Sequence, residues 1–124
     1  MIHKTILMGT MLIFVALALV ACGGGATTGS GASAVSITVT LTEFKFDPAT
    51  ITVAPGQTVN LTVKNTGSID HTFVIPSANV KVTAGPGKTE TKTFTAPTAA
   101  GTYDFDCDIA GHKAAGMVGK LIVK

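Results

Sequence analysis

Short runs of alternating apolar and polar residues fill the chain from Val35 to its end. Five of them have a clear period of two residues, at 35–41, 50–53, 58–63, 89–95 and 102–106. This alternation predicts strands that bury one face and expose the other. Thr, Val and Ile dominate the runs, and their β-branched side chains fit a pleated, half-buried surface. The pattern therefore predicts an all-β domain.

Turn-forming residues separate the runs at Pro48, Pro55-Gly56, Asn65 to Gly67, Gly85 to Gly87, and Pro97 with Gly101. Seven or eight short strands at this interval favour a Greek-key β-sandwich or barrel. The segment 77–83 has no clear pattern and is compatible with a loop or a short irregular strand. We expect the inward sides of the strands to form the core, namely Ile37, Val39, Leu41, Phe46, Ile51, Val53, Val59, Leu61, Val63, Phe73, Ile75, Phe94, Tyr103, Phe105, Leu121 and Val123.

The residues before the domain divide into two segments. Residues 1–22 combine a short basic start with an uncharged apolar stretch, which is typical of an export signal. The stretch ends in Leu-Val-Ala-Cys22, which resembles a bacterial lipobox and predicts lipidation of Cys22; an uncleaved anchor is the alternative. Residues 23–34 contain Gly, Ala, Ser and Thr without periodicity, as in a flexible linker. The folded domain is expected at 35–124.

Charge excludes one large class of function. Nine lysines less Lys4 leave eight against seven acidic residues once the export signal is set aside, and the chain has no Arg. Neither the balance nor the composition matches the basic footprint of a nucleic-acid binder, so we expect no nucleic-acid partner. Asp104 and Asp106 alternate with apolar residues and are expected to face solvent.

One stretch near the C-terminus carries the candidate chemistry. It places Cys107, His112 and Met117 in a Cys-x4-His-x4-Met spacing, with Gly111 and Gly116 between them. Glycine tolerates the positive φ of tight turns, so one loop can direct all three side chains to a single point. His71, which opens the apolar run Phe73 to Ile75, is the candidate for a second imidazole.

This donor set selects a metal. One Cys with two His and a weak axial Met is the set of blue-copper electron-transfer sites. Zinc is the competing metal, but it prefers four strong ligands, and Met is a poor ligand for it. The cysteine count supports ligation, because acylation of Cys22 would leave Cys107 without a disulfide partner in an oxidising compartment.

Several motifs together resemble a known family. They are Glu43-Phe-Lys-Phe-Asp-Pro, Gly56-Gln-Thr-Val, Asp70-His-Thr-Phe-Val-Ile, and the stretch from Cys107 through Met117 to Val123. Over 36–124 the chain resembles the cupredoxins, or type 1 blue copper proteins, and among them the plastocyanin, azurin and auracyanin group.

The resemblance implies one copper per chain, held by His71, Cys107 and His112 with a long contact to Met117. It also implies a hydrogen bond from the backbone or hydroxyl of Thr72 to the Cys107 sulfur. His112 would be the electron exit, within a partner patch of small residues formed by Gly111, His112, Ala114, Ala115 and Gly116.

These expectations describe a monomeric electron carrier rather than an enzyme. It would be exported, and either anchored by lipid to the outer face of the cytoplasmic membrane or held in the periplasm. It would meet transient redox partners such as a cytochrome, an oxidase, a reductase or a photosynthetic complex. The alternative is a copper trafficking or storage protein of the cell envelope. A copper enzyme would need further histidines, and the chain has three in all.

Overall fold

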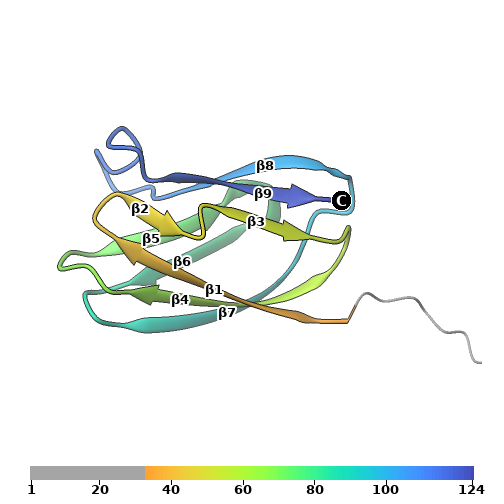
Figure 1. The fold of residues 1–124 in the computed structure, drawn as a ribbon, viewed down its shortest axis with the longest axis horizontal. Helices are drawn as coiled ribbons and strands as arrows, with labels where there is room; N and C mark the ends of the chain where they lie inside the picture. Colours follow the sequence, from red (N-terminus) through yellow and green to blue (C-terminus); the bar gives the residue numbers. More distant parts are fainter. Residues whose placement is uncertain (1–32) are drawn as a thin grey trace, which may run out of the picture.

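The computed structural model describes residues 33–124, which form nine β-strands and one short 3-10 helix (Figure 1). The predicted export signal, Cys22 and nearly all of the predicted linker lie outside the described residues. The strands are β1 (Val35–Thr42), β2 (Lys45–Asp47), β3 (Thr50–Val53), β4 (Thr58–Asn65), β5 (His71–Ile75), β6 (Val80–Ala84), β7 (Thr89–Thr95), β8 (Gly101–Asp106) and β9 (Val118–Val123).

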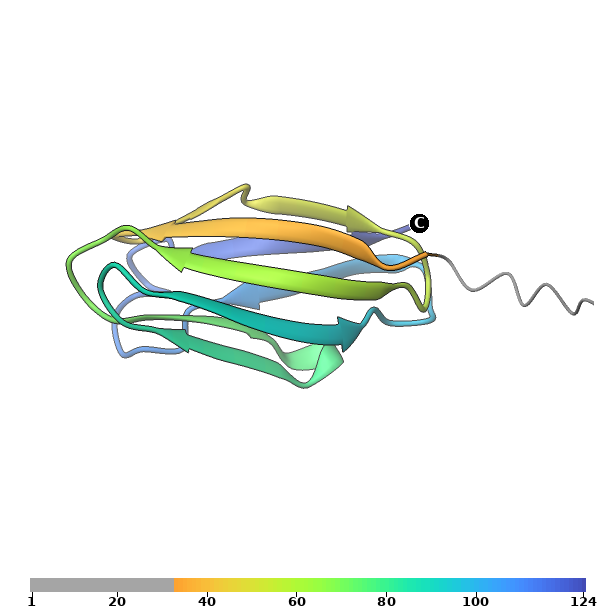
Figure 2. The same cartoon turned by 90° about the horizontal axis from the view of Figure 1, so that it is seen from below.

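The strands form two sheets that face each other as a sandwich (Figure 2). One sheet has the order β2-β1-β4-β7, and the other has the order β3-β9-β8-β5-β6. Two neighbouring pairs are parallel, β1 with β4 and β3 with β9, and the remaining pairs are antiparallel. The predicted all-β sandwich is confirmed.

The strand number exceeds the predicted seven to eight because two short elements lacked a sequence signal. The three-residue β2 is too short to show a period. The ambiguous segment 77–83 begins in the 3-10 helix η1 (Pro76–Ala78), turns through Asn79 in the left-handed conformation, and then enters β6. Buried and exposed residues alternate within β6 itself, but the preceding helix and turn have no such period, so the segment as a whole showed no clear pattern.

Three phenylalanines pack against one another in the core. Phe46 lies edge-on to Phe73 and to Phe105, at ring-centroid distances of 5.6 and 5.2 Å, and Phe73 and Phe105 are 4.8 Å apart. Gly119 of β9 pairs with Phe105 of β8, and a Cβ atom on Gly119 would lie 2.2 Å from the Phe105 ring. This close approach explains the glycine inside a strand. Of the expected core, Ile37 and Tyr103 are only partly buried, whereas Val80, Val82, Ala84 and Ala96 join it.

The chain direction brings several strand ends to one end of the sandwich. β5 begins there at His71, β8 ends there at Asp106, and β9 begins there at Val118. Residue 33 enters at the opposite end (Figure 1). Within residues 33–124, no helix is long and apolar enough to cross a membrane.

Candidate metal centre

The structure brings together three of the predicted ligands from separate positions in the chain. His71 is the first residue of β5, Cys107 directly follows β8, and His112 lies in the loop between β8 and β9. One donor atom from each lies within 4.8 Å of the other two, and all three residues are buried. The arrangement places a thiol and two imidazoles around one point, and His71, the predicted second imidazole, is one of them.

The donor geometry fits a metal ion. The Cys107 Sγ to His112 Nδ1 distance is 3.4 Å. Metal bonds of about 2.0 Å to imidazole and 2.3 Å to thiolate, at tetrahedral or trigonal angles, separate such donors by about 3.5–3.8 Å. His71 is fully buried, yet neither of its ring nitrogens has a hydrogen-bond partner in the described part of the chain. Buried polar atoms are normally paired, and an ion at this point would pair one of them.

Burial also favours the neutral form of the His71 imidazole. Desolvation lowers the pKa of this imidazole below its ordinary value, and the neighbouring His112 adds to the effect. The neutral imidazole is the form that binds a metal. The site thus favours the ligating form of His71 before any metal arrives.

Backbone hydrogen bonds give the loop between β8 and β9 its shape. The His112 amide donates to the Ile109 carbonyl (3.0 Å), and the Met117 amide donates to the His112 carbonyl (3.1 Å). Gly111 and Gly116 have φ values of 86° and 102°, so the predicted need for glycine in these turns is confirmed. The Cys107 amide donates to the Met117 carbonyl (3.2 Å), which closes the loop at its base. The Met117 side chain is fully buried.

Thr72 approaches the Cys107 sulfur with both of its polar groups. The Thr72 amide nitrogen and its Oγ1 each lie 3.4 Å from Cys107 Sγ. The predicted contact between Thr72 and the sulfur is therefore present. It links β5 to the start of the loop between β8 and β9, which we call the ligand loop.

Asp108 binds the same threonine from the other side. Its amide donates to Thr72 Oγ1 (2.9 Å), and its Oδ1 accepts from that hydroxyl (2.7 Å). Its second oxygen, Oδ2, accepts from Lys81 Nζ of β6 (2.6 Å). The Lys81 hydrogen bond, with that of Thr72, lowers the pKa of the Asp108 carboxyl.

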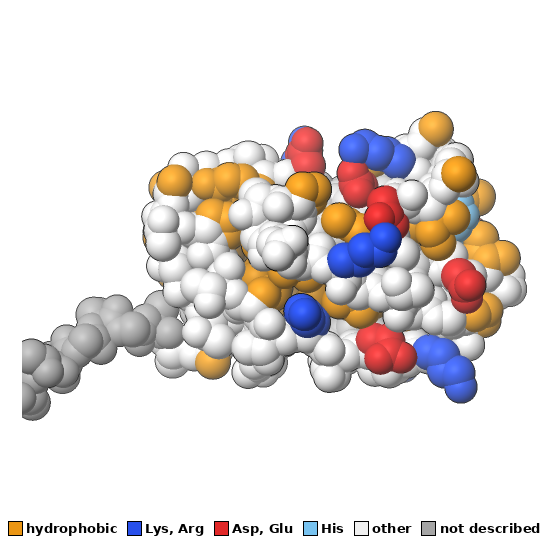
Figure 3. Space-filling model, turned by 180° about the vertical axis from the view of Figure 1, so that it is seen from behind, with side chains coloured by type: hydrophobic (Ala, Val, Ile, Leu, Met, Phe, Trp, Pro, Cys, Tyr) orange, Lys and Arg blue, Asp and Glu red, His pale blue; other side chains and the backbone are white. Residues whose placement is uncertain are grey.

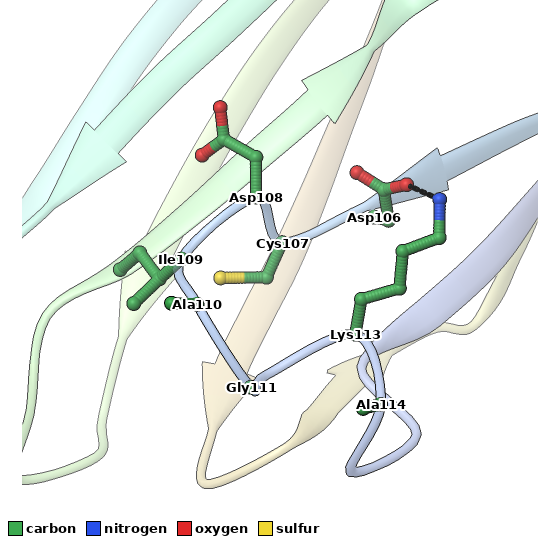
Figure 4. Close-up of a pocket in the computed structure, with 8 residues that line it drawn as sticks. All are labelled: Asp106, Cys107, Asp108, Ile109, Ala110, Gly111, Lys113 and Ala114. Atoms are coloured by element: carbon green, nitrogen blue, oxygen red, sulfur yellow. Dashed lines mark hydrogen bonds and ion pairs between the residues drawn. The ribbon is translucent and has the colours of Figure 1, made fainter.

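Asp106 differs from its sequence prediction. Strand alternation predicted a solvent-facing carboxylate, and this is correct for Asp104, but Asp106 is buried with 8% exposure. The reason is Lys113, which reaches back from the ligand loop and forms an ion pair with Asp106 (Figure 4). The carboxylate raises the pKa of Lys113. Figure 4 also shows Asp106 and Asp108 on either side of Cys107, along a hollow lined by residues 106–111, Lys113 and Ala114.

An exposed aromatic ring contacts His112 at the rim of the site. Phe44, in the turn between β1 and β2, lies edge-on to the imidazole with ring centroids 5.2 Å apart. Its φ is 61°, an uncommon conformation for a bulky residue. The adjacent Glu43 secures the turn, because its Oε1 accepts from the Ser68 amide (2.6 Å) and hydroxyl (2.9 Å). These hydrogen bonds lower the pKa of Glu43.

The rim is the surface at which the site approaches solvent. Figure 3 shows histidine surface bordered by hydrophobic side chains at the end far from residue 33. Because His71 is fully buried, this surface belongs to His112. Of the predicted patch, Gly111, Ala114, Ala115 and Gly116 are exposed, and His112 is buried to 9% exposure. Phe44, which also contacts His112, was not part of the predicted patch.

Comparison with known proteins identifies relatives over most of the chain. The family model described as a cupredoxin-like domain matches residues 10–123. Auracyanin-A from Chloroflexus aurantiacus is 35% identical, with 87% of this chain and 90% of the relative covered. The copper-resistant cuproprotein CopI from Rubrivivax gelatinosus is 38% identical over 64% of this chain and 60% of its own length. Rusticyanin from Acidithiobacillus ferrooxidans is 39% identical over 60% of each protein. The chain thus spans less than two thirds of the last two relatives.

A solved structure agrees with the sequence relatives. Reduced auracyanin from Roseiflexus castenholzii superposes with a TM-score of 0.64 at 29% identity, over 76% of this chain and 98% of that one. The resemblance predicted from the motifs is confirmed by these matches. Together with the His71, Cys107 and His112 cluster, they also confirm copper as the cofactor.

Proposed function

Because the chain belongs to the cupredoxin-like family, we propose that it is a mononuclear type 1 copper protein that carries single electrons between redox partners. One observation carries the proposal: a buried thiol faces two imidazoles, and one of these is fully enclosed with unpaired ring nitrogens. A thiolate with two imidazoles is the strong-ligand set of blue-copper electron-transfer sites.

Each ligand has a distinct role in the proposed site. His71, Cys107 and His112 would hold the ion, and the Met117 thioether would be an additional weak ligand. When bound, copper supplies a one-electron couple. The sheet and the hydrogen-bonded loop fix the donors in one arrangement, and the packing around them excludes water. A fixed donor arrangement keeps the structural change on electron transfer small.

The His112 rim is the proposed route for electrons. Gly111, Ala114, Ala115 and Gly116 around it are small and exposed, so a partner can approach the imidazole edge closely. Small and weak interfaces suit transient redox encounters. The proposed partners are redox proteins of a cell envelope, of the cytochrome, oxidase, reductase or photosynthetic class. The site carries electrons to and from such partners and transforms no substrate of its own.

The proposed location follows from the sequence before the domain. We propose export through the signal at 1–22 and anchoring by lipid on Cys22. The Gly- and Ser-rich segment 23–34 would give the domain an average reach of about 20 Å from the membrane. That reach would let the rim meet partners in several orientations.

A second function is favoured by one relative. CopI is named a copper-resistant cuproprotein, which points to copper handling rather than electron transport in that protein. A trafficking or storage role would use the same donors, but it would require release of the ion. Retention of copper through oxidation and reduction separates the two functions.

The test uses the full-length chain loaded with Cu(II), beside a Cys107→Ser variant. We expect an intense thiolate-to-copper band in the visible and a small parallel hyperfine splitting in electron paramagnetic resonance, both lost in the variant. Repeated chemical reduction and reoxidation should then return the full band without release of copper. Loss of copper on reduction would favour storage, and a colourless wild-type protein would refute the type 1 site.

A further inference from the structure

We infer that Asp108, held by Lys81, is a positioning residue that turns the Thr72 hydroxyl away from the Cys107 sulfur and so lowers the reduction potential of the site. The inference rests on the proposed copper site at Cys107. Thr72, Asp108 and Lys81 are not copper ligands in the proposed site. The decisive feature is the single proton of the Thr72 hydroxyl.

The Thr72 hydroxyl has three neighbours and one proton. Asp108 N donates to Oγ1 at 2.9 Å, Asp108 Oδ1 lies 2.7 Å away, and Cys107 Sγ lies 3.4 Å away. A hydroxyl can accept two hydrogen bonds but can donate one. The carboxylate and the thiolate both need a donor, so they compete for the same proton.

The carboxylate wins this competition. A hydrogen bond from a hydroxyl to a carboxylate oxygen at this distance is charge-assisted and short. Sulfur is a weaker acceptor. Cys107 Sγ lies 3.4 Å from Thr72 Oγ1, which is 0.7 Å farther than Asp108 Oδ1 at 2.7 Å. Lys81 holds the second Asp108 oxygen at 2.6 Å and thereby keeps the carboxylate facing Thr72. The hydroxyl proton therefore points to Asp108.

The sulfur consequently receives one donor from Thr72 rather than two. The Thr72 amide, 3.4 Å away, still points to Sγ. The oxygen at the same distance presents a lone pair, whose partial negative charge repels electron density on the thiolate. Hydrogen bonds to the cysteine sulfur tune the potential of such sites. With one of them withheld, the thiolate donates more strongly to the oxidised ion, which is thereby favoured.

The chain contains a matched control for the charge of Asp108. Asp106 also neighbours Cys107 in sequence and is also paired with a lysine, Lys113. Within residues 33–124, the Asp106 carboxylate accepts from Lys113 Nζ and forms no hydrogen bond with Thr72. Loss of either carboxylate removes one negative charge near the site, but only loss of Asp108 frees the Thr72 hydroxyl.

The test compares Asp108→Asn with Asp106→Asn in the copper-loaded full chain. In Asp108→Asn, Lys81 selects the amide oxygen, which leaves the amide NH2 facing Thr72 Oγ1. The hydroxyl must then donate to the sulfur. We expect Asp108→Asn to raise the reduced-to-oxidised ratio at a fixed ambient potential about tenfold more than Asp106→Asn does, or about 59 mV for one electron. The thiolate-to-copper band should move to higher energy in Asp108→Asn alone.

A double-mutant cycle with Thr72→Val isolates the hydroxyl. In the Thr72→Val background, Asp108→Asn should shift the potential no more than Asp106→Asn does, because no hydroxyl remains to turn. Equal shifts from the two Asn variants in the native background would overturn the inference. An excess for Asp108→Asn that persists with Thr72→Val would also overturn it. A wild-type protein without the thiolate-to-copper band would refute the proposed function, and the inference with it.

Discussion

The candidate ligands come from two kinds of structure, a strand and a loop. His71 is the first residue of β5 and pairs with Ala84 of β6. The same strand continues into the core at Phe73. Cys107, His112 and Met117 stand on a loop that is shaped by its own backbone hydrogen bonds. The strand ligand is fully enclosed, whereas the loop brings His112 to the rim. The sheet thus supplies one buried donor, and the loop supplies two more buried side chains together with His112, the one that approaches solvent.

The loop is nevertheless held at its base by the sheet. Its ends continue into β8 and β9, and the Cys107 amide bonds to the Met117 carbonyl across them. A rigid base allows a loop to place donors with the precision of a strand. Substitutions in the base and in the two histidines test this division between strand and loop.

Gly119→Ala should disturb the base on which the loop stands. The new Cβ would lie 2.2 Å from the Phe105 ring and 2.8 Å from the Ala49 carbonyl oxygen. Overpacking of this kind destabilises a core by about 1–3 kcal/mol, and this contact favours the upper end. Chemical unfolding of the metal-free protein measures the change.

Gly85→Ala is the matched control for this substitution. Its nearest neighbour would be Asp70 Oδ1 at 3.4 Å, so we expect a change within about 0.5 kcal/mol. If Gly119→Ala lowered the free energy of unfolding as little as Gly85→Ala, the Phe105 ring and the Ala49 carbonyl would have moved aside without strain. The base of the loop would then be softer than its packing indicates.

His71→Leu should stabilise the metal-free protein while it removes the site. Two ring nitrogens without partners are buried at this position, and an unpaired buried polar group costs about 1–3 kcal/mol. Leucine has no polar atom to leave unpaired. We expect a higher free energy of unfolding without metal and no further gain on addition of copper, by thermal or chemical unfolding.

His112→Leu makes the corresponding substitution in the loop. His112 already has a partner in Cys107 Sγ at 3.4 Å and lies at the rim, so the gain should be below about 1 kcal/mol. A gain in unfolding free energy at position 112 as large as at position 71 would show that the unpaired ring nitrogens of His71 carry no extra cost in the metal-free protein.

The sequence predicted the two halves of the site for different reasons. The alternation of Thr with Val, Ile and Phe located most strands, because a half-buried strand leaves a local period of two. Cys107, His112 and Met117 could be predicted because their spacing and the intervening glycines are local too. His71 was found through chemistry, as the missing imidazole. The cluster of His71, Cys107 and His112 agrees with these predictions, and their ligand roles stay a proposal.

The surroundings of the donors could not be predicted in the same way. The burial of Asp106 depends on Lys113 folding back, and the contact of Phe44 with His112 depends on a turn in the other sheet. The hydrogen bonds of Asp108 with Thr72 and Lys81 join residues that are far apart in sequence. Such contacts arise from tertiary structure, and no local pattern records them.

Glu43→Gln should produce the smallest effect, and one that depends on pH. The Ser68 hydrogen bonds lower the pKa of Glu43 below its ordinary 4.5, so the ionised form is favoured in the folded state. Its stabilisation is therefore present above about pH 4.5 and is lost as the pH falls through the lowered folded value. We expect Glu43→Gln to reduce the melting temperature slightly at pH 7 and not at low pH.

Glu90→Gln, which removes an exposed carboxylate from β7, controls for the general loss of a negative charge. If both variants showed the same pH profile, the Glu43 to Ser68 hydrogen bonds would make no measurable contribution to the turn that carries Phe44.

Strand β1 runs from the end of the sandwich at residue 33 to the end that holds the candidate metal centre. The strand starts near residue 33 and ends at the turn of Phe44, beside His112, so its eight residues separate the two by about 25 Å. Residue 33 therefore lies at the end of the sandwich opposite the end where the His112 imidazole approaches solvent. Within residues 33–124, His112 is the one candidate ligand whose ring approaches solvent. Under the proposed function, an electron donor and an electron acceptor would therefore bind the same surface one after the other, and a complex with both at once would be excluded.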